Sequence, residues 1–249
     1  MDVRTAYEKS WQEQRGREAR NRNSGSLSRL RDRLSQSRYE VARRYALEAV
    51  NAGQRAALAD IGCGRGEILQ NLGPLFIRSV GLDVAATELG RLAAGWPEEL
   101  RSRMELKSAD LNDTWPLESA SFDLITCLAV LEHLFDPYFV ASELARICKP
   151  GAHLILEVPN IAFIGYRLSL LRGSFPSTSG DDVLWDGGHL HYFTIHDLRK
   201  LFTGAGFQII GVSTCGFLSK IRSLWPVALG RDLVILLRRN DDTAGPARA

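Results

Sequence analysis

The sequence predicts an α/β fold in which helices cover both faces of a doubly wound, mostly parallel sheet of seven strands. Short apolar runs, most of them separated by helical patterns, carry this prediction, and the first run ends in a glycine-rich turn that leads directly into a helix. Strand–helix repeats require right-handed crossovers and parallel neighbours, whereas the helix-poor connection before the last strand permits an antiparallel strand there. The expected strands are residues 58–61, 79–83, 104–107, 122–127, 153–158, 207–212 and 233–237.

Helix signals lie between these runs. Apolar residues recur at helical spacing in residues 39–50. Asp136 followed by Pro137 supplies an N-cap and a first-turn proline for another helix, and Thr194 caps a third. A short amphipathic helix, ended by a proline, is expected within residues 217–230.

Length and composition predict one domain. The chain has 249 residues, of which 45% are hydrophobic, so it can bury a full core. We expect the domain at residues 38–239, after a polar, arginine-rich extension at 1–37 and before a disordered tail at 240–249. The extension is either a solvated tail or a lid anchored by Tyr7 and Trp11.

The charge and cysteine content restrict the functional class. A net charge of +2 argues against a strongly electrostatic partner such as nucleic acid. No apolar run approaches the roughly twenty residues of a membrane span, and the first residues do not resemble a signal peptide, so we expect a cytoplasmic protein. The four cysteines form no CxxC pair, which favours reduced thiols inside a core.

A glycine-rich loop follows the first strand. Gly62, Gly64 and Gly66 lack a Cβ atom where the backbone must turn sharply and approach a ligand closely. A dinucleotide loop of the GxGxxG type would need glycine at position 67, where the chain has Glu67. With Asp60 before the loop and Glu67 after it, the site repels phosphate and favours a cationic ligand.

Two further carboxylates follow later strands. Asp83 ends the second strand, about twenty residues after the glycine loop, where an acid can bind a ribose diol. Asp110 follows the third strand and can accept a hydrogen bond from an adenine amino group. Together with Asp60 they describe a pocket for an adenosine that carries a positive charge, a description that S-adenosylmethionine fits.

On these residues the chain resembles the class I S-adenosylmethionine-dependent methyltransferases. The resemblance runs from about Asp60 to Arg238 and depends on DIGCGRGE at 60–67, GLD at 81–83, SADL at 108–111, FDLITCLAVLEHL at 122–134 and CKPGAHLILEVPN at 148–160. It implies a Rossmann-like seven-stranded sheet with an antiparallel last strand and S-adenosylmethionine as cofactor. The implied cofactor-binding residues are Asp60, Gly62, Cys63, Gly64, Gly66, Asp83, Val84, Asp110, Leu111 and Leu128.

The stretch LEHL at 131–134 resembles that of ubiquinone-biosynthesis O-methyltransferases. In those enzymes a carboxylate three positions before the equivalent of Glu132 joins the Glu-His pair in a metal site. Ala129 occupies that position here, so we expect no metal. Glu132 and His133 are then either polar structural residues or, in the case of His133, a catalytic or substrate-contacting group.

The long connection at 160–192 is expected to cover the substrate, or to pack on the sheet or on a second copy of the chain. Its end, HLHYFT at 189–194, resembles the methyltransferase-like protein of methionine biosynthesis and bacterial sugar methyltransferases. His189 and His191 are the best candidates for a general base, followed by His133; the competing interpretation is that they satisfy backbone groups near a helix cap.

Two functions remain open. The first is O-methylation of a small hydroxylated metabolite, such as a sugar, a glycolipid precursor or a quinol-like ring, by a monomer or homodimer. The second is a cofactor-binding but non-catalytic partner or regulator of another biosynthetic enzyme. The spacing of the glycine loop disfavours a third, an NAD-dependent oxidoreductase.

Overall fold

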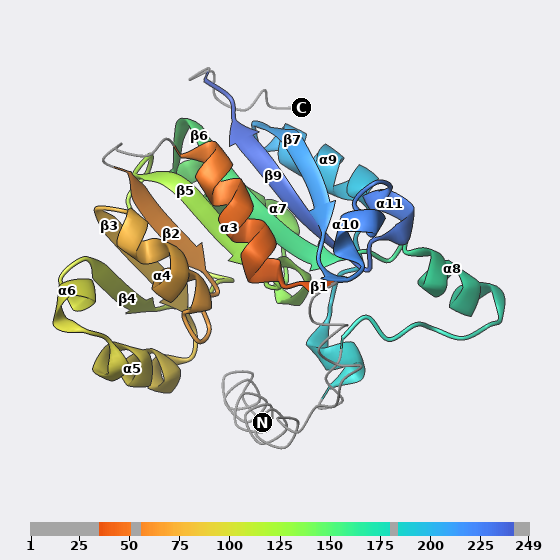
Figure 1. Ribbon diagram of the computed structural model, residues 1–249, viewed down its shortest axis with the longest axis horizontal. Helices are drawn as coiled ribbons and strands as arrows, with labels where there is room; N and C mark the ends of the chain where they lie inside the picture. The colour runs from red at the N-terminus through yellow and green to blue at the C-terminus, as the bar shows by residue number, and fades with distance from the viewer. Residues whose placement is uncertain (1–34, 51–55, 180–183, 242–249) are drawn as a thin grey trace.

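The computed structural model describes residues 35–50, 56–179 and 184–241, so most of the predicted extension and tail lies outside the described residues. Its centre is a seven-stranded sheet with the order β4-β3-β2-β5-β6-β9-β7. All neighbours are parallel except those of β9, which is antiparallel to both β6 and β7. This arrangement confirms the predicted fold class (Figure 1). The strands are β2 (Ala57–Ile61), β3 (Arg78–Asp83), β4 (Met104–Ser108), β5 (Phe122–Leu128), β6 (Cys148–Pro159), β7 (Phe207–Thr214) and β9 (Asp232–Arg239).

The strand order reverses between β2 and β5. From β2 the chain continues to β3 and β4 on one side, whereas β5 and β6 lie on the other. In such sheets the loops that leave the two central strands diverge and open a crevice at their carboxyl ends. The glycine loop follows β2, and the Glu132-His133 pair follows β5, so the topology brings both to this crevice.

Two helix layers enclose the sheet. Helices α3 (Arg38–Ala49) and α4 (Glu67–Leu72) pack on one face, and α7 (Pro137–Ile147) and α9 (Ile195–Gly204) on the other (Figure 1). A further helix, α5 (Ala86–Gly95), follows β3. Each layer has its own hydrophobic cluster, and the buried faces of the strands separate the two clusters.

The predicted caps form. Asp136 accepts a hydrogen bond from the Tyr138 backbone at the start of α7, with Pro137 in the first turn. Thr194 caps α9 in a reciprocal capping box with Asp197. A similar box between Ser37 and Glu40 starts α3, so the backbone at the beginning of this helix is fixed where its first turn meets the crevice.

The segment 217–230 differs from the prediction of one helix ended by a proline. It contains α10 (Ser219–Arg222) and α11 (Pro226–Leu229), and Pro226 begins the second of these instead of ending the first. Proline favours the first helical turn because its missing N–H has no partner there, and it keeps the residue before it out of the helical region. A short strand, β8 (Gly216–Phe217), pairs with β1 (Ser35–Gln36) just before α3.

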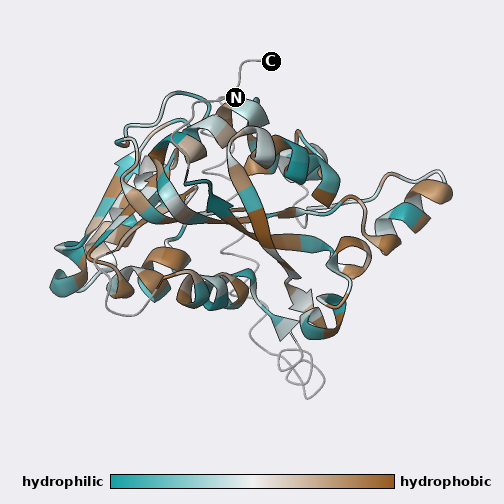
Figure 2. Ribbon diagram, turned by 90° about the horizontal axis from the view of Figure 1, so that it is seen from above, coloured by the Kyte–Doolittle hydropathy of each residue, from teal (hydrophilic) through white to brown (hydrophobic). Residues whose placement is uncertain are grey.

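The connection 160–192 contains α8 (Ile164–Leu171) and the short helix η3 (Trp185–Gly188), and further helical turns are η1 (Gly73–Leu75), α6 (Glu98–Arg101) and η2 (Leu131–His133). Figures 1 and 2 show α8 on an arm that projects from the sheet. Leu171 on this arm is 82% exposed, and Trp185 is 76% exposed. Its predicted role as a cover for the substrate stays a prediction.

The four cysteines are free and buried, in agreement with the predicted core thiols. Within the described residues, no helix combines the length and apolarity that crossing a membrane would need.

Candidate functional site

A cavity of about 1130 Å³ lies at the carboxyl ends of the central strands. The glycine loop lines one part of it, and Glu132, His133 and His189 line another; we refer to these parts as the glycine-loop end and the histidine end. Its lining contains two guanidinium groups, from Arg38 and Arg65, against a larger number of carboxylates. The acidic lining residues are Asp60, Glu67, Asp83, Asp110, Glu132, Glu157 and Asp232.

The backbone of the glycine loop depends on conformations that favour glycine. Gly62, Gly64 and Gly66 have φ values of 68°, 48° and 71°. The N–H groups of Gly62 and Cys63 donate to the Leu82 carbonyl oxygen at 2.7 and 3.2 Å, which attaches the loop to the end of β3. A Cβ atom on Gly62 would lie 2.2 Å from a methyl carbon of Val130, so the loop packs directly against the segment that follows β5.

Asp83 holds the loop from its other side. One carboxylate oxygen of Asp83 accepts from the Gly64 N–H at 2.8 Å, and the other accepts from the Ala85 N–H at 2.9 Å. Each oxygen keeps a further lone pair for a ligand hydroxyl. Asp110, which is exposed, similarly uses one oxygen to accept from the backbone and side chain of Asn112.

Asp60 is the buried carboxylate of this end. It is 4% exposed, and its Oδ1 accepts from the Thr126 hydroxyl at 2.7 Å across the β2–β5 pairing. Burial raises the pKa of Asp60 to about 7, and the hydrogen bond from Thr126 opposes that shift. A cationic ligand nearby would favour the ionised form.

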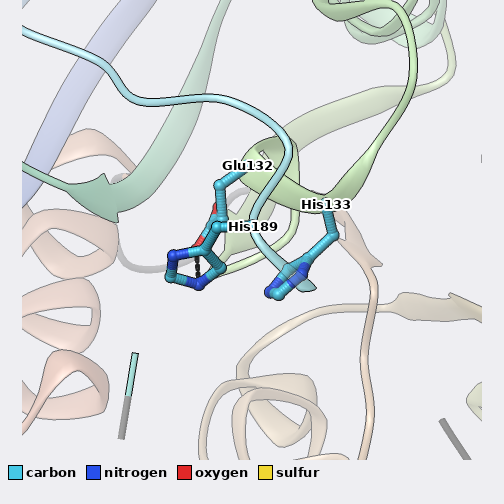
Figure 3. A group of neighbouring side chains, drawn as sticks. All are labelled: Glu132, His133 and His189. Carbon is cyan, nitrogen blue, oxygen red and sulfur yellow. Dashed lines mark ion pairs between the residues drawn. The ribbon is translucent and has the colours of Figure 1, made fainter. Parts of the chain in front are cut away.

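The histidine end joins two distant segments. Glu132 lies on η2 directly after β5, and its backbone carbonyl accepts from the N–H groups of Leu190 and His191 at 2.8 and 3.1 Å. This contact places His189 beside Glu132 and His133. The His133 and His189 rings meet edge to face with centroids 4.7 Å apart, and Figure 3 shows the imidazole of His189 against the Glu132 carboxylate.

Burial controls the protonation of these groups. It raises the pKa of Glu132 well above its usual value, and the neighbouring Glu157 adds to the shift. It lowers the pKa of His133 to about 4 and also lowers that of His189, although Asp186 opposes the second shift. Both imidazoles are therefore neutral at pH 7 and able to accept a proton.

A partly buried ion pair completes the cavity. Arg38, at the start of α3, donates to Glu157 at the end of β6 with an N–O distance of 2.9 Å. Burial raises the pKa of Glu157 to about 7, while the Arg38 charge opposes this. The sequence analysis missed Arg38, Glu157 and Asp232 as lining residues. The sequence does contain a signal for Glu157, because it is a single carboxylate within an apolar strand. It contains no such signal for Arg38.

The structure brings most of the predicted site residues together. Two do not line the cavity: Gly66 is the N-cap of α4, and the ring of His191 contacts the Phe135 carbonyl oxygen at 3.2 Å. The predicted residues that line it are Asp60, Gly62, Cys63, Gly64, Asp83, Val84, Asp110, Leu111, Leu128, His133 and His189.

The sheet order, the antiparallel β9 and the glycine loop define a class I S-adenosylmethionine-dependent methyltransferase fold. A family described as a methyltransferase domain matches residues 24–212, and the chain belongs to this family.

Individual relatives are more distant. A ubiquinone biosynthesis O-methyltransferase from Xanthomonas oryzae pv. oryzae (strain PXO99A) is 28% identical over 120 residues, which are 48% of this chain and 50% of that protein. The matched region thus spans about half the length of this relative.

Two solved structures share the fold. One is a chain in a complex between a Haloferax volcanii methyltransferase activator and a putative methyltransferase, with a TM-score of 0.64, 15% identity, and coverage of 96% of this chain and 98% of that one. The other is an S-adenosylmethionine-dependent methyltransferase from Mesorhizobium loti, with a TM-score of 0.60, 17% identity, and coverage of 82% and 98%.

We predict that Gly62→Ala destabilises the protein by about 2–4 kcal/mol, because the new Cβ overlaps Val130 and the positive φ strains any other residue. Thermal unfolding measures the effect. Gly90→Ala in α5, where a Cβ would meet nothing within 4 Å, is the matched control and should be neutral or stabilising. Equal melting temperatures for the Gly62 variant and the wild type would contradict the packing of the loop on Val130.

We also predict that Asp60→Asn flattens the pH dependence of stability in the ligand-free protein. The folded-state pKa of Asp60 is about 7, above its ordinary value of 3.8, so folding takes up a proton between these values. The contribution of this group to stability is therefore present at acidic pH and is lost as the pH rises toward 7. Denaturant unfolding at pH 5 and pH 8 should show a smaller difference for the variant, on the order of a few kcal/mol at most. An unchanged difference would show that Asp60 ionises normally.

Proposed function

We propose that this protein transfers a methyl group from S-adenosylmethionine to a hydroxyl oxygen of a small metabolite, such as a sugar, a glycolipid precursor or a quinol-like ring. One observation carries the proposal: an acidic glycine-loop end and a pair of neutral histidines line the same cavity. The first suits a cationic adenosine ligand, and the second suits a hydroxyl group that must lose a proton.

The residues at the glycine-loop end fit the cofactor. Gly64 lines the cavity without a side chain, Gly62 lets the loop pack on Val130, and the lone pairs of Asp83 are available to ribose hydroxyls. Asp110 would accept from the adenine amino group. The excess of carboxylates over guanidinium groups in the lining favours a sulfonium over a pyrophosphate. S-adenosylmethionine would supply an electrophilic methyl group in this cavity.

The protein itself contributes position and proton transfer. Binding in the cavity would bring donor and acceptor into alignment, and this proximity accounts for most of the catalysis in a displacement of this kind. A hydroxyl acceptor also has a proton to lose, and we assign its removal to the histidine end. His189 and His133 are favoured over His191 because their rings line the cavity, whereas His191 is not among the lining residues.

We predict that Asp83→Ala weakens binding of S-adenosylmethionine by about 10- to 100-fold, because the variant loses the two side-chain oxygens that would accept from the ribose hydroxyls. Titration calorimetry on the full chain measures this. The matched control is Asp113→Ala, which removes an exposed carboxylate outside the cavity lining and should bind like the wild type. An undisturbed affinity in the Asp83 variant would refute the pocket assignment.

For the reaction, we predict that the wild-type protein transfers labelled methyl groups to a metabolite of a cell extract, detected by mass spectrometry. His189→Ala should lower the rate by about 100-fold or more without changing the cofactor affinity, whereas His191→Ala should have a smaller effect. Cofactor binding without any labelled product would favour the competing function, a non-catalytic partner of another enzyme. Full turnover by His189→Ala would remove that residue from the role of base.

A further inference from the structure

We propose that Glu132, His133 and His189 bind a divalent transition-metal ion, with two imidazole nitrogens and one carboxylate on one side of the ion and open positions toward the cavity. One ring nitrogen of each histidine and one carboxylate oxygen of Glu132 lie within 4.8 Å of one another, and Figure 3 shows the three side chains together. With metal bonds of about 2.0–2.2 Å, ligand atoms are about 3 Å apart, so small side-chain rotations would close the site. Ala129 led us to expect no metal, but His189 supplies the third donor from a distant segment.

Hydrogen bonds orient His189 for this role. The Thr178 hydroxyl donates its single proton to Asp186 Oδ2 at 2.5 Å, so its oxygen must accept from His189 Nδ1, which lies 2.7 Å away. The proton of the neutral ring is therefore on Nδ1, and Nε2 carries a lone pair. This Nε2 lies 4.0 Å from Glu132 Oε1.

His133 has a similar partner on the same ring nitrogen, Nδ1. Its Nδ1 lies 3.2 Å from the Gly188 carbonyl oxygen, which can only accept, so the proton is again on Nδ1. Nε2 of His133 then carries the lone pair that can bind a metal ion. Such contacts from carbonyl and hydroxyl or carboxylate groups fix the tautomer and ring orientation of metal-binding histidines.

The Glu132 carboxylate supplies an independent observation. The residue is 1% exposed, and its Oε2 has no hydrogen-bond partner among the described residues. A buried carboxylate oxygen without a partner is costly, and an oxygen facing the lone pair of His189 Nε2 adds repulsion. A cation among these groups would satisfy both.

The donor set selects the kind of ion. Two imidazoles with one carboxylate suit zinc, iron(II), cobalt(II) or manganese(II), whereas magnesium and calcium prefer oxygen ligands. The second cluster of potential ligands, Glu157, Cys215 and Asp232, differs because Arg38 already neutralises Glu157. With both Nε2 atoms on the ion and both Nδ1 protons in place, the histidines would not accept the proton of the acceptor directly. A hydroxyl group at an open metal position would instead have its pKa lowered and release its proton to solvent, so this inference deepens the proposed function, on which only that last step depends.

The test measures metal binding without cofactor or acceptor. The full chain is treated with a chelator, dialysed and titrated with zinc and cobalt(II) by calorimetry, and the bound metal is counted by elemental analysis. We expect one ion per chain at this site, with affinity at least tenfold weaker in Glu132→Gln and His189→Ala. Thr178→Val, which removes only the contact that orients His189, should weaken binding by about 10- to 100-fold. His196→Ala removes an exposed histidine outside the cavity lining and should bind like the wild type.

A stability measurement separates a metal site from a structural role for Glu132. Glu132→Gln keeps the shape of the side chain and removes a carboxyl group whose charged form burial disfavours, so the metal-free variant should melt at the same or a higher temperature than the metal-free wild type. Zinc should raise the melting temperature of the wild type more than that of the variant. The inference would be overturned if the wild type bound no stoichiometric metal, or if the wild type and Glu132→Gln bound metal with equal affinity. Cofactor calorimetry on the same samples reports independently on the proposed function.

Discussion

The parallel pairing of β2 with β5 is the constraint on which both ends of the cavity depend. It sets Asp60 opposite Thr126, whose hydroxyl donates a hydrogen bond to the buried carboxylate. It also places the glycine loop, which follows β2, beside η2, which follows β5. Gly62 then packs against Val130, two residues before Glu132. A shift of either strand would move the glycine-loop end and the histidine end relative to each other, so alignment of the two ends depends on this register.

Local signals predicted much of the fold and the glycine-loop end. Apolar runs located the strands, and the capping residues Asp136 and Thr194 located two helix starts. The glycine loop was predictable because its residues lie close together in the sequence. The loop needs positive φ values, and glycine is the residue type that adopts them readily.

The histidine end was only partly predictable, because its geometry depends on long-range contacts. Alternation in an extended segment would give His189 and His191 the same side, but their rings have different partners, the Thr178 hydroxyl for His189 and the Phe135 carbonyl oxygen for His191. Backbone hydrogen bonds to Glu132 then set the two rings in different places. The Arg38–Glu157 pair likewise joins residues that no local pattern connects. The spacing of residues in the sequence predicts which of them share a helix or strand, but it does not predict which helices, strands and loops contact one another.

Four buried carboxylates line the cavity. Asp83 accepts hydrogen bonds from two backbone N–H groups, and the other three are stabilised to different degrees. Glu157 is paired with Arg38, whose charge opposes the rise of its pKa to about 7 that burial causes. Asp60 accepts only from the neutral Thr126 hydroxyl among its described side-chain contacts, and its pKa of about 7 shows how weakly this supports a charge. Glu132 has an oxygen with no described hydrogen-bond partner. Buried acids without cations destabilise a ligand-free protein, so their retention is best explained by ligands that bring positive charge. A sulfonium at the glycine-loop end and a metal ion at the histidine end would provide that charge at separate places, and each would stabilise the fold as it binds.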